Sequence, residues 1–445
     1  MSDSNVVAGT SPAASALAEK IRLKTAKVGV VGLGYVGLPL AVEYAHAGFH
    51  VTGIDLIESK TQRVNEGDSY IGDVPSDVLS KEVKAGRLRA TTDFSALMEL
   101  DTVNIAVPTP LRKTKDPDMS YIVAACEEIA RYIHPGMLII LESTTYPGTT
   151  DELVLPMLEK SGLKVGVDFF LCFSPERVDP GNPNFQTKNI PKVVGGTTPD
   201  CTMLGSLFYS QALDHVVPVS STQVAEMVKL LENTFRMINI GLVNELAIMC
   251  DGMGINVWEV IEAAATKPFG FMPFYPGPGL GGHCIPIDPF YLSWKTKQAG
   301  IEARFIDLAG QINGSMPHFV VDKVTSALNS VGKPVKGSKI IIFGMSYKRD
   351  IDDVRESPAF DVMLLLERRG GIVSYCDPHV PQIHLEKKGG VMDAVGQDAV
   401  KDADCVVIIT DHSTFDYKAL VANAKLIVDT RNALKGVKSD KIVRL

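Results

Sequence analysis

The sequence predicts an α/β protein in which two parallel-sheet domains are joined by a central helical domain. Three observations lead to this prediction. Short apolar runs rich in β-branched residues alternate with helical segments in the first half of the chain, the same alternation returns in its last quarter, and a long helical stretch lies between the two regions. Strands that alternate with helices form parallel sheets whose two faces are covered.

Length and charge agree with several globular domains. The chain has 445 residues, which corresponds to about three domains at roughly 150 residues each. Hydrophobic residues make up 45% of the chain, and 44 basic against 52 acidic residues give a net charge of −8. Because the chain is acidic and shows no basic stripe, we expect no nucleic-acid partner.

The sequence contains no sign of a membrane span or of a disulfide framework. No stretch reaches the roughly eighteen apolar residues that a membrane span needs, and the first two dozen residues lack the apolar core of a secretory signal. We therefore expect no membrane partner and a cytoplasmic location. The seven cysteines are odd in number and form no C-x-x-C pair, which predicts free thiols and no metal site.

The first sheet domain is predicted over residues 26–212, after a flexible N-terminal extension over 1–25. From Lys27 the sequence KVGVVGLGYVGLPLAVEYAHAGFHVTGIDL reads as a strand, a glycine turn, a helix that ends near Gly48, and a second strand. Further strands are expected at 102–107, 137–141 and 168–173, and a helix at 119–133.

A central helical domain is predicted over 213–332. Residues 222–265 carry apolar side chains at spacings of three and four, which is typical of helices, and the apolar face of this stretch suggests a dimer seam. The Pro/Gly-rich segment PFGFMPFYPGPGLGGHCIPIDP comes next, and loops of this length in compact proteins are usually functional. Helices then resume to about Gly332.

The last domain is predicted over 333–445. The runs SKIIIFGMS, GIVSYCDP, DCVVIIT and KLIVDTRN are expected to form strands, with a helix at 357–369 after the first of them. This pattern predicts a second, smaller parallel sheet.

A glycine pattern after the first strand predicts a dinucleotide site. It matches G-x-G-x-x-G between a strand and a helix, and an acidic residue ends the next strand. The glycines permit a tight turn and close approach of the backbone to a pyrophosphate, the helix N-terminus attracts its charge, and the acid binds ribose hydroxyls. No arginine follows the acid to receive a 2′-phosphate, so we expect NAD. The expected contacts are Gly32, Gly34, Tyr35, Val36, Gly37 and Asp55. Because both sheet domains share the alternation of strands and helices, both are predicted to be Rossmann-like.

Cys284, in the segment GGHCIPIDP, is a candidate nucleophile. The glycines before it allow the backbone to approach a ligand, and Asp288 could hold a water or an ammonium group near the sulfur. The alternative is a buried cysteine in a rigid turn. His283 is interpreted as a structural or substrate-adjacent residue.

Two further motifs carry polar candidates. Lys229 and Asn233 are four residues apart in the long helical stretch, hence on one helix face, where an amine beside an amide can stabilise an oxyanion. A solvated helix face is the alternative. Glu176, in FSPER after a predicted strand, could activate a water or form an ordinary loop ion pair. Thr109 and Thr144 also follow strands, at the edge where cofactor and substrate would meet.

These motifs, in this order, resemble the UDP-glucose/GDP-mannose dehydrogenase family from about Lys27 to the end of the chain. GGHCIPIDP looks like the catalytic-cysteine loop of the family, AEMVKLLEN like its lysine and asparagine helix, FSPER like its glutamate segment, and YKRDIDDVRESP like the start of its nucleotide-sugar domain. Within the family, ESTTYPGTT, SPERVDPGNPNF and the cysteine loop are most similar to bacterial UDP-N-acetylglucosamine 6-dehydrogenases.

The resemblance implies a four-electron oxidation of the sugar C6 hydroxyl to a carboxylate, with two NAD⁺ consumed. A water near Lys229 and Asp288 would take the hydroxyl proton, Cys284 would hold the aldehyde as a thiohemiacetal and then a thioester, and Glu176 would help water to hydrolyse it. Lys229 and Asn233 would stabilise the oxyanions, and Thr109 would order the water.

The resemblance also implies the remaining binding residues. Substrate contacts are expected from Glu176, Arg177, Lys229, Asn233, Tyr275, Gly281, Lys348 and Arg431. Additional cofactor contacts are expected from Thr109, Thr144 and Arg355. Some UDP-glucose enzymes carry basic residues ahead of the cysteine loop, where this chain has Phe269, Phe271, Phe274 and Tyr275, and this difference fits a pocket for an N-acetyl group.

The expected activity is therefore oxidation of UDP-N-acetylglucosamine to its uronic acid, by a homodimer or larger homo-oligomer, for surface polysaccharide or O-antigen precursors. The same chemistry on UDP-N-acetylmannosamine or UDP-glucose is the first alternative. A two-electron hydroxy-acid dehydrogenase with a structural Cys284 and a non-catalytic NAD-binding module are the others.

Overall fold

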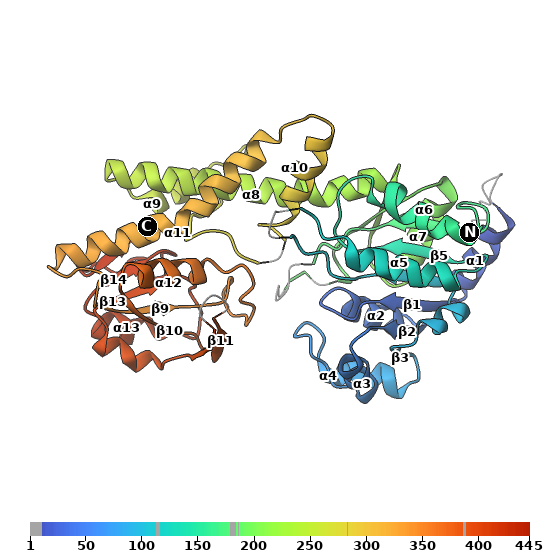
Figure 1. Ribbon diagram of the computed structural model, residues 1–445, viewed down its shortest axis with the longest axis horizontal. Helices are drawn as coiled ribbons and strands as arrows, with labels where there is room; N and C mark the ends of the chain where they lie inside the picture. Colours follow the sequence, from blue (N-terminus) through green and yellow to red (C-terminus); the bar gives the residue numbers. More distant parts are fainter. Residues whose placement is uncertain (1–10, 113–115, 179–183, 186, 283, 386–388) are drawn as a thin grey trace. The chain divides into compact units, whose positions relative to one another are not determined.

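The computed structural model describes residues 11–112, 116–178, 184–185, 187–282, 284–385 and 389–445. The chain divides into two compact units. The first contains Met1–Glu232 and Trp294–Ala299, and the second contains Asn233–Ser293 and Gly300–Leu445. Each unit is built around one large sheet, labelled in Figure 1. The proposed separation of a central helical domain from the two sheet domains stays a prediction.

The sheet of the first unit has the strand order β3-β2-β1-β4-β5-β6-β7-β8 and is parallel except where β7 pairs antiparallel with β6. Its strands are β1 (Lys27–Val31), β2 (His50–Ile54), β3 (Leu88–Thr91), β4 (Thr102–Ile105), β5 (Leu138–Leu141), β6 (Phe170–Phe173), β7 (Lys192–Gly196) and β8 (Val216–Val219). The predicted first βαβ unit is confirmed, whereas β3, β7 and β8 were not predicted. Strand β8 completes this sheet although it lies beyond the predicted domain end at residue 212.

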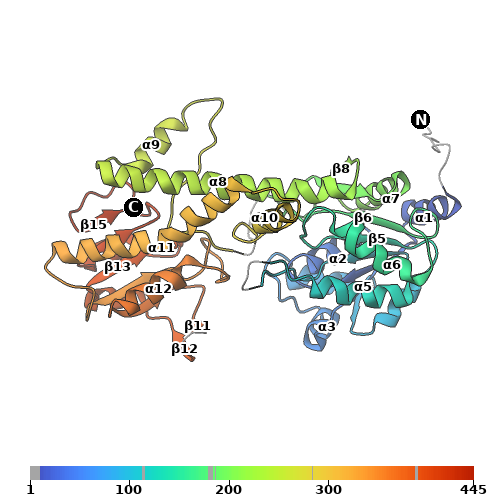
Figure 2. The same ribbon diagram turned by 45° about the horizontal axis from the view of Figure 1, so that its top comes forward.

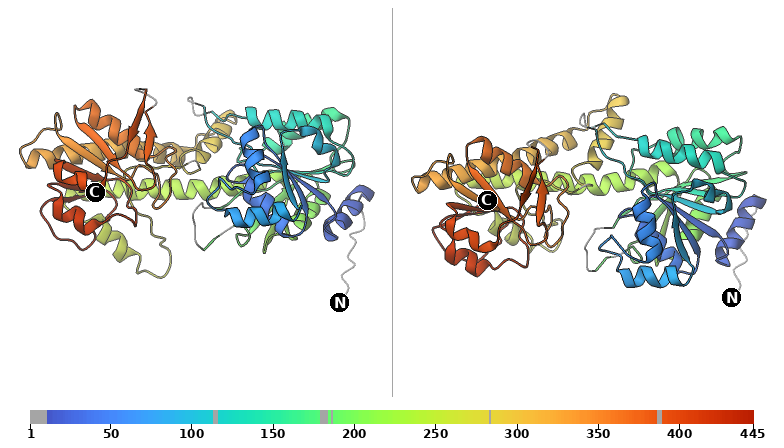
Figure 3. Two further views of the ribbon diagram at one scale, coloured as in Figure 1. Left: turned by 90° about the horizontal axis from the view of Figure 1, so that it is seen from below. Right: turned by 60° about the horizontal axis from the view of Figure 1, so that its bottom comes forward.

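Helices cover both faces of this sheet (Figure 3). They are α1 (Pro12–Arg22), α2 (Gly37–His46), α3 (Glu58–Glu66), α4 (Ser76–Lys84), α5 (Ser120–Tyr132), α6 (Leu155–Leu158) and α7 (Pro199–Tyr209), with short turns η1 (Phe94–Glu99), η2 (Thr150–Val154) and η3 (Glu159–Ser161). In β5, Leu138 and Ile140 join one core while Ile139 and Leu141 join the other. A strand buried on both faces is therefore apolar throughout, which explains why its sequence shows no alternation.

The described part of the N-terminal segment is a helix, so the prediction of a flexible extension is wrong for these residues. Ser11 caps α1 by accepting a hydrogen bond from the backbone N–H of Ala14, and Pro12 occupies the first turn. Leu17 and Ile21 are one turn apart on the same face and are buried in a core that they share with α7. This apolar stripe holds the segment against the first unit.

The second unit has a parallel sheet of order β10-β9-β13-β14-β15. Its strands are β9 (Lys339–Phe343), β10 (Ile372–Cys376), β13 (Cys405–Ile408), β14 (Ile427–Asp429) and β15 (Ile442–Arg444), and a separate antiparallel pair is formed by β11 (Gln382–His384) and β12 (Val391–Asp393). Together with the first sheet, this arrangement confirms the predicted α/β class with two parallel sheets.

The helices of the second unit include two long ones. Helix α8 (Thr222–Met253) begins in the first unit and ends in the second, and α11 (Arg304–Ser330) packs on α12 (Pro358–Arg368), as Figure 2 shows. Helix α10 (Asp288–Gln298) begins in the second unit and ends in the first, and the remaining helices of the second unit are α9 (Val257–Ala264), α13 (Tyr417–Asn423) and η4 (Gln397–Asp402). At the crossing of α8 and α11 a Cβ on Gly241 would lie 3.2 Å from Ala309, so a glycine lets these helices approach closely.

Candidate active site

The glycine turn between β1 and α2 has the geometry of a dinucleotide loop. Gly32 has φ +93°, and a Cβ there would lie 2.6 Å from the carbonyl oxygen of Ala106. A Cβ on Gly37 would lie 1.8 Å from the carbonyl oxygen of Gly32. A Cβ on Gly34 would meet nothing within 4 Å, so this glycine faces open space where a pyrophosphate fits. Tyr35 in the same turn is half exposed.

Asp55 follows β2 and supports the same turn. One carboxylate oxygen accepts a hydrogen bond from the backbone N–H of Leu33 at 2.9 Å, and the other accepts from Ile57 at 3.0 Å. Oδ2, which accepts from Leu33, also pairs with the Lys60 ammonium at 3.5 Å, whereas Oδ1 keeps a second lone pair that can accept a ribose hydroxyl. The glycine turn and this acid therefore fit NAD, which supplies a hydride acceptor when it is bound.

The segment after β5 lies beside the end of β4. Ser143 donates to the carbonyl oxygen of Val107 at 2.8 Å, which joins this segment to the chain that leads to the buried Thr109. Thr144 is partly buried. The buried Thr145 hydroxyl makes no hydrogen bond among the described residues. An unsatisfied hydroxyl at the carboxyl end of a parallel strand is a candidate for binding water or ligand, and our sequence reasoning missed it.

A buried carboxylate of α8 holds the same segment. Glu226 accepts hydrogen bonds from the backbone N–H of Gly148 at 2.6 Å, from that of Thr150 at 2.9 Å, and from the Thr150 hydroxyl at 2.7 Å. Burial raises the pKa of Glu226 to about 7, although these hydrogen bonds favour the carboxylate. The sequence pattern gave no reason to single out this glutamate.

Glu176 follows β6 and is buried with defined partners. Its Oε1 accepts the backbone N–H groups of Arg177 and Val178 at 2.8 and 3.0 Å, and its Oε2 accepts a hydrogen bond from the Lys192 ammonium at 2.9 Å. Lys229 donates to the carbonyl oxygen of Glu176 at 2.6 Å. The first unit thus brings two of the predicted site residues, Glu176 and Lys229, into direct contact.

Lys192 is the main residue that sequence reasoning missed here. Only 4% of its surface is exposed, and its ammonium also donates to Glu142 at 2.6 Å. A lysine at the start of an apolar strand usually lies at the surface, so its position in IPKVVGG gave no distinct signal. Arg177, a predicted substrate residue, forms a two-pronged ion pair with Glu232, with N···O distances of 2.6 and 3.2 Å.

In the second unit, Cys284 lies on a tight turn that leads into α10. Its carbonyl oxygen accepts hydrogen bonds from the backbone N–H groups of Ile287 at 3.1 Å and Asp288 at 2.8 Å, and Cys284 itself is exposed. The side chain of Asp288 is buried and accepts a hydrogen bond from the Asn233 amide at 2.6 Å. The structure therefore brings Asn233 and Asp288 together. His283 lies outside the described residues.

Glycines ahead of Cys284 pack against the loop that follows β9. A Cβ on Gly281 would lie 2.5 Å from Cβ of Tyr347, and Gly282, at φ +84°, donates its N–H to the carbonyl oxygen of Arg355 at 3.0 Å. The Arg355 guanidinium pairs with Asp353 at 2.6 Å. These two glycines are thus required for close contact between the cysteine loop and the loop after β9.

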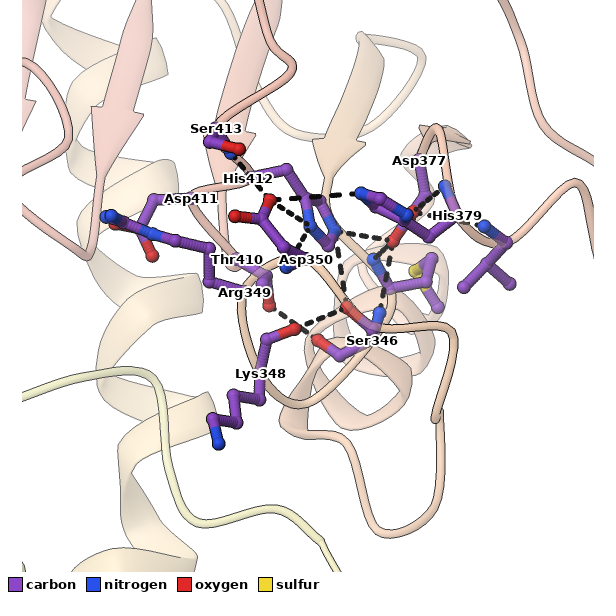
Figure 4. Close-up of polar contacts among 12 residues, drawn as sticks. Ser346, Lys348, Arg349, Asp350, Asp377, His379, Thr410, Asp411, His412 and Ser413 are labelled. Atoms are coloured by element: carbon purple, nitrogen blue, oxygen red, sulfur yellow. Dashed lines mark hydrogen bonds and ion pairs between the residues drawn. The ribbon is translucent and has the colours of Figure 1, made fainter. Parts of the chain in front are cut away.

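The loop after β9 is held by a buried histidine (Figure 4). Nε2 of His412 lies 3.1 Å from Asp377 and 3.2 Å from the Ser346 hydroxyl, and Nδ1 accepts the backbone N–H of Asp350 at 2.9 Å. Although burial opposes ionisation, the hydrogen bond from His412 holds the pKa of Asp377 below its ordinary value. The Lys348 side chain extends away from this cluster in Figure 4.

In the part of the chain that the structure describes, three residues of this cluster are near enough to one another to be considered as ligands of a metal ion. One atom each of Asp350, His379 and His412 lies within 4.8 Å of the others. Both ring nitrogens of His412 already take part in hydrogen bonds, however. We therefore interpret the cluster as a hydrogen-bond network that orders the loop after β9. The absence of a metal site stays a prediction.

Two further predicted substrate residues lie in the second unit. Arg431 donates from Nε to the carbonyl oxygen of Ile409 at 2.8 Å, and no carboxylate lies within 4.0 Å of its guanidinium among the described residues. Loss of solvent and then the charge of Arg349 lower the pKa of Arg431 to about 10. Tyr275 is half exposed and stacks on Trp258, with ring centroids 6.1 Å apart.

The predicted site residues are therefore shared between the units. The glycine turn, Asp55, Thr109, Thr144, Glu176, Arg177 and Lys229 belong to the first, and Asn233, Tyr275, Gly281, Cys284, Asp288, Lys348, Arg355 and Arg431 to the second. In the described part of the chain, no helix is both long enough and apolar enough to span a bilayer.

A Rossmann sheet with this glycine turn and acid defines the class, which is an NAD-dependent oxidoreductase. Models of the UDP-glucose/GDP-mannose dehydrogenase family match the chain with the NAD binding domain over residues 26–213, the central domain over 223–315 and the UDP binding domain over 341–436. The chain belongs to this family and is an NAD-dependent nucleotide-sugar dehydrogenase.

Individual relatives cover nearly the whole chain. A UDP-N-acetyl-D-mannosamine dehydrogenase from Salmonella typhi is 36% identical over 422 residues, which cover 91% of this chain and 98% of that protein. A UDP-N-acetyl-D-glucosamine 6-dehydrogenase from Pseudomonas aeruginosa is 36% identical over 397 residues, covering 88% and 92%. The solved structure of a UDP-D-ManNAc dehydrogenase from Pyrococcus horikoshii matches with a TM-score of 0.86 at 32% identity, covering 94% and 98%.

Proposed function

We propose that this enzyme oxidises C6 of UDP-N-acetylglucosamine to a carboxylate through a thioester on Cys284. The exposure of Cys284 is the observation that carries the proposal, because the other six cysteines are all buried. A thiol on a rigid turn, accessible and preceded by glycines, suits a nucleophile rather than a core residue.

The proposed reaction consumes one alcohol, two NAD⁺ and one water, and releases one carboxylate, two NADH and three protons. NAD⁺ bound at the glycine turn and Asp55 would supply the hydride acceptor for both oxidation steps. Asp288, held by Asn233, receives the hydroxyl proton through a water, and Lys229 stabilises negative charge on the sugar oxygen. Thr109 positions the water.

The Cys284 sulfur adds to the aldehyde carbon, and its thiol proton passes to the carbonyl oxygen. This addition is needed because the aldehyde carbon can release a second hydride only after a nucleophile has added to it. The thiohemiacetal then loses its hydride and hydroxyl proton and becomes a thioester. Glu176 removes a proton from the attacking water, the C–S bond breaks, and this proton passes to the sulfur, so that Cys284 leaves as the thiol. The buried position of Glu176 and its defined hydrogen bonds support this role.

Features of the second unit support a UDP-sugar substrate. No carboxylate of the described residues pairs with the Arg431 guanidinium, which suits a diphosphate or uracil oxygen. Residues 269–275 carry aromatic side chains and no basic one, and the exposed ring surface of Tyr275 suits the methyl group of an N-acetyl substituent. Lys348 and Arg355 are proposed as further contacts to substrate and cofactor.

UDP-N-acetylmannosamine is the second candidate substrate, because a relative named for that sugar is as similar to this chain as the one named for UDP-N-acetylglucosamine. The two sugars are epimers at C2. We also propose a homo-oligomer with exposed apolar residues of α8, such as Leu242 and Met249, at a subunit interface, a cytoplasmic location, and a role in surface polysaccharide precursor synthesis.

The test is the amount of NADH formed per mole of nucleotide sugar consumed, measured for the parent and for Cys284→Ala with both sugars and with UDP-glucose. Two NADH per UDP-N-acetylglucosamine, together with loss of steady turnover in Cys284→Ala, would support the proposal. One NADH per sugar, unaffected by the substitution, would refute the thioester route. Faster turnover of UDP-N-acetylmannosamine would reassign the substrate.

A further inference from the structure

The first unit contains a buried set of three charges that the reaction outlined above does not use in full. Lys192, at the start of β7, bridges Glu142 after β5 and Glu176 after β6, with N···O distances of 2.6 and 2.9 Å. The side chains of Glu142, Glu176 and Lys192 are 0%, 11% and 5% exposed. Charges this deeply buried are stable only when they are paired and hydrogen-bonded.

Glu142 is the member of this set that holds the Lys192 ammonium in place. It accepts a hydrogen bond from the Asn104 amide at 2.8 Å and another from the Tyr209 hydroxyl, in addition to the Lys192 ammonium. The ammonium also lies over the ring of Tyr209, 5.4 Å from its centroid. Lys192 is thus held in one place by groups that do not themselves contact Glu176.

Glu176 is the member of this set that we propose to accept a proton from water. A carboxylate offers about four lone-pair sites. Oε1 uses two of them for the backbone N–H groups of Arg177 and Val178, and Oε2 uses one for Lys192. Counting the contacts of the described residues, one site remains, on Oε2, where this carboxylate can accept a proton from water. The ammonium therefore fixes both the position and the orientation of the basic atom.

The charges explain why an ammonium is needed at this position. Burial alone favours the neutral acid, but the Lys192 ammonium holds the pKa of Glu176 below its ordinary value. Burial raises the pKa of Glu142, and the charge of Glu176 adds to this effect. Without the ammonium, two adjacent buried carboxylates would repel each other and one of them would take up a proton.

We infer that Lys192 is a positioning residue for the hydrolytic step, in which it keeps Glu176 ionised and aims its Oε2 at the water that attacks the thioester. This inference rests on the proposed function, because it assigns Lys192 a part in the hydrolysis of the Cys284 thioester. The oxidation steps do not depend on it.

The test compares Lys192→Met with the parent by rapid mixing of enzyme, NAD⁺ and UDP-N-acetylglucosamine. We expect a burst of two NADH per active site, then steady turnover at least about tenfold slower than in the parent, with the acyl group detected on Cys284 by mass spectrometry. The rate of hydrolysis should also rise at alkaline pH, since Glu176 would then ionise only at higher pH. A purely structural role would not shift this pH profile.

Three variants make the result decisive. Lys192→Arg retains the positive charge and should turn over without a burst, and Lys160→Met, at an exposed position, serves as the control for the substitution itself. The double variant Lys192→Met/Glu142→Gln keeps the net charge of the site, so it can be tested even if the single variant does not fold. It should show the same burst and the same alkaline shift.

The outcomes separate the two proposals. If Glu176→Gln shows no burst, Glu176 is not the hydrolytic base and the proposed mechanism fails. Suppose instead that Glu176→Gln shows a burst, but Lys192→Met hydrolyses the thioester at the parent rate and with the parent pH profile. The role of Lys192 is then refuted and the proposed function stands. If only the double variant folds, the same comparison is made with the double variant.

Discussion

The Glu226 carboxyl should make the stability of the first unit fall as the pH rises from 4.5 to about 7. Its pKa is about 7 in the folded protein, against an ordinary value of 4.5. The folded state therefore keeps this proton to higher pH than the unfolded state does, and the stabilisation is complete below pH 4.5 and lost by about pH 7. Each pKa unit corresponds to about 1.4 kcal/mol, so the loss is about 3 kcal/mol.

Glu226→Gln removes the titration and should flatten this dependence. At pH 5 the variant should be less stable than the parent by about 1–3 kcal/mol, because the amide cannot accept all the hydrogen bonds from Gly148 and Thr150. Between pH 5 and pH 8 the stability of the variant relative to the parent should rise by about 3 kcal/mol. Glu152→Gln, an exposed carboxyl in the same segment, is the matched control and should show no such rise.

The assay is urea unfolding of each variant at several pH values, followed by tryptophan fluorescence. The chain has two tryptophans. In a Trp258→Phe background only Trp294 remains, and its ring centroid lies 4.9 Å from that of Tyr146 in the segment that Glu226 holds. Parallel stability curves for parent and Glu226→Gln across this range would refute the reasoning, because they would show that this carboxyl does not titrate there.

Three other predictions follow from single positions. Gly37→Ala places a Cβ 1.8 Å from a backbone oxygen and should destabilise the first unit. A Cβ at Gly34 meets nothing within 4 Å, so Gly34→Ala should leave the melting temperature unchanged. Calorimetry should nevertheless show NADH binding to Gly34→Ala that is about tenfold weaker. Phe208→Ala empties a fully buried site and should lower the free energy of unfolding in urea by about 3–5 kcal/mol; a loss below 1 kcal/mol would contradict the packing. His412→Leu removes the hydrogen bond to Asp377 and should weaken UDP binding about tenfold with NADH binding unchanged. Equal losses of affinity for both ligands would contradict the role of His412 in ordering the loop after β9.

Local sequence was sufficient to predict most of the elements that frame the site. The first βαβ unit could be predicted because the glycine turn, the helix and Asp55 are close together in the chain, and each step has a local physical reason. The cysteine loop could be predicted for the same reason, since Gly281, Gly282 and Cys284 lie within four consecutive residues. Strand β7, with the sequence KVVGG, was missed because its apolar run is only two valines followed by two glycines, and β8 was missed because Pro218 is unfavourable in a strand.

The helical nature of residues 12–22 also had a local signal that was overlooked. Ser11 followed by Pro12 is a common start of a helix, and Leu17 and Ile21 are spaced by one turn. What the local pattern does not contain is the partner, because the core that buries these side chains is shared with α7, almost two hundred residues later in the chain.

By itself, therefore, the sequence determined the α/β class and the NAD turn and supplied the candidates for the reactive groups, because each of these depends on a motif of residues close together in the chain. Only the tertiary structure decided which charges are buried and paired. Lys192 meets Glu142 across 50 residues, and Glu226 meets Thr150 across 76. Burial and pairing set the ionisation of a carboxyl, and both arise from contacts between distant segments. A motif can therefore single out Glu176 as a candidate base, whereas the ammonium that pairs with it is found only in the folded chain.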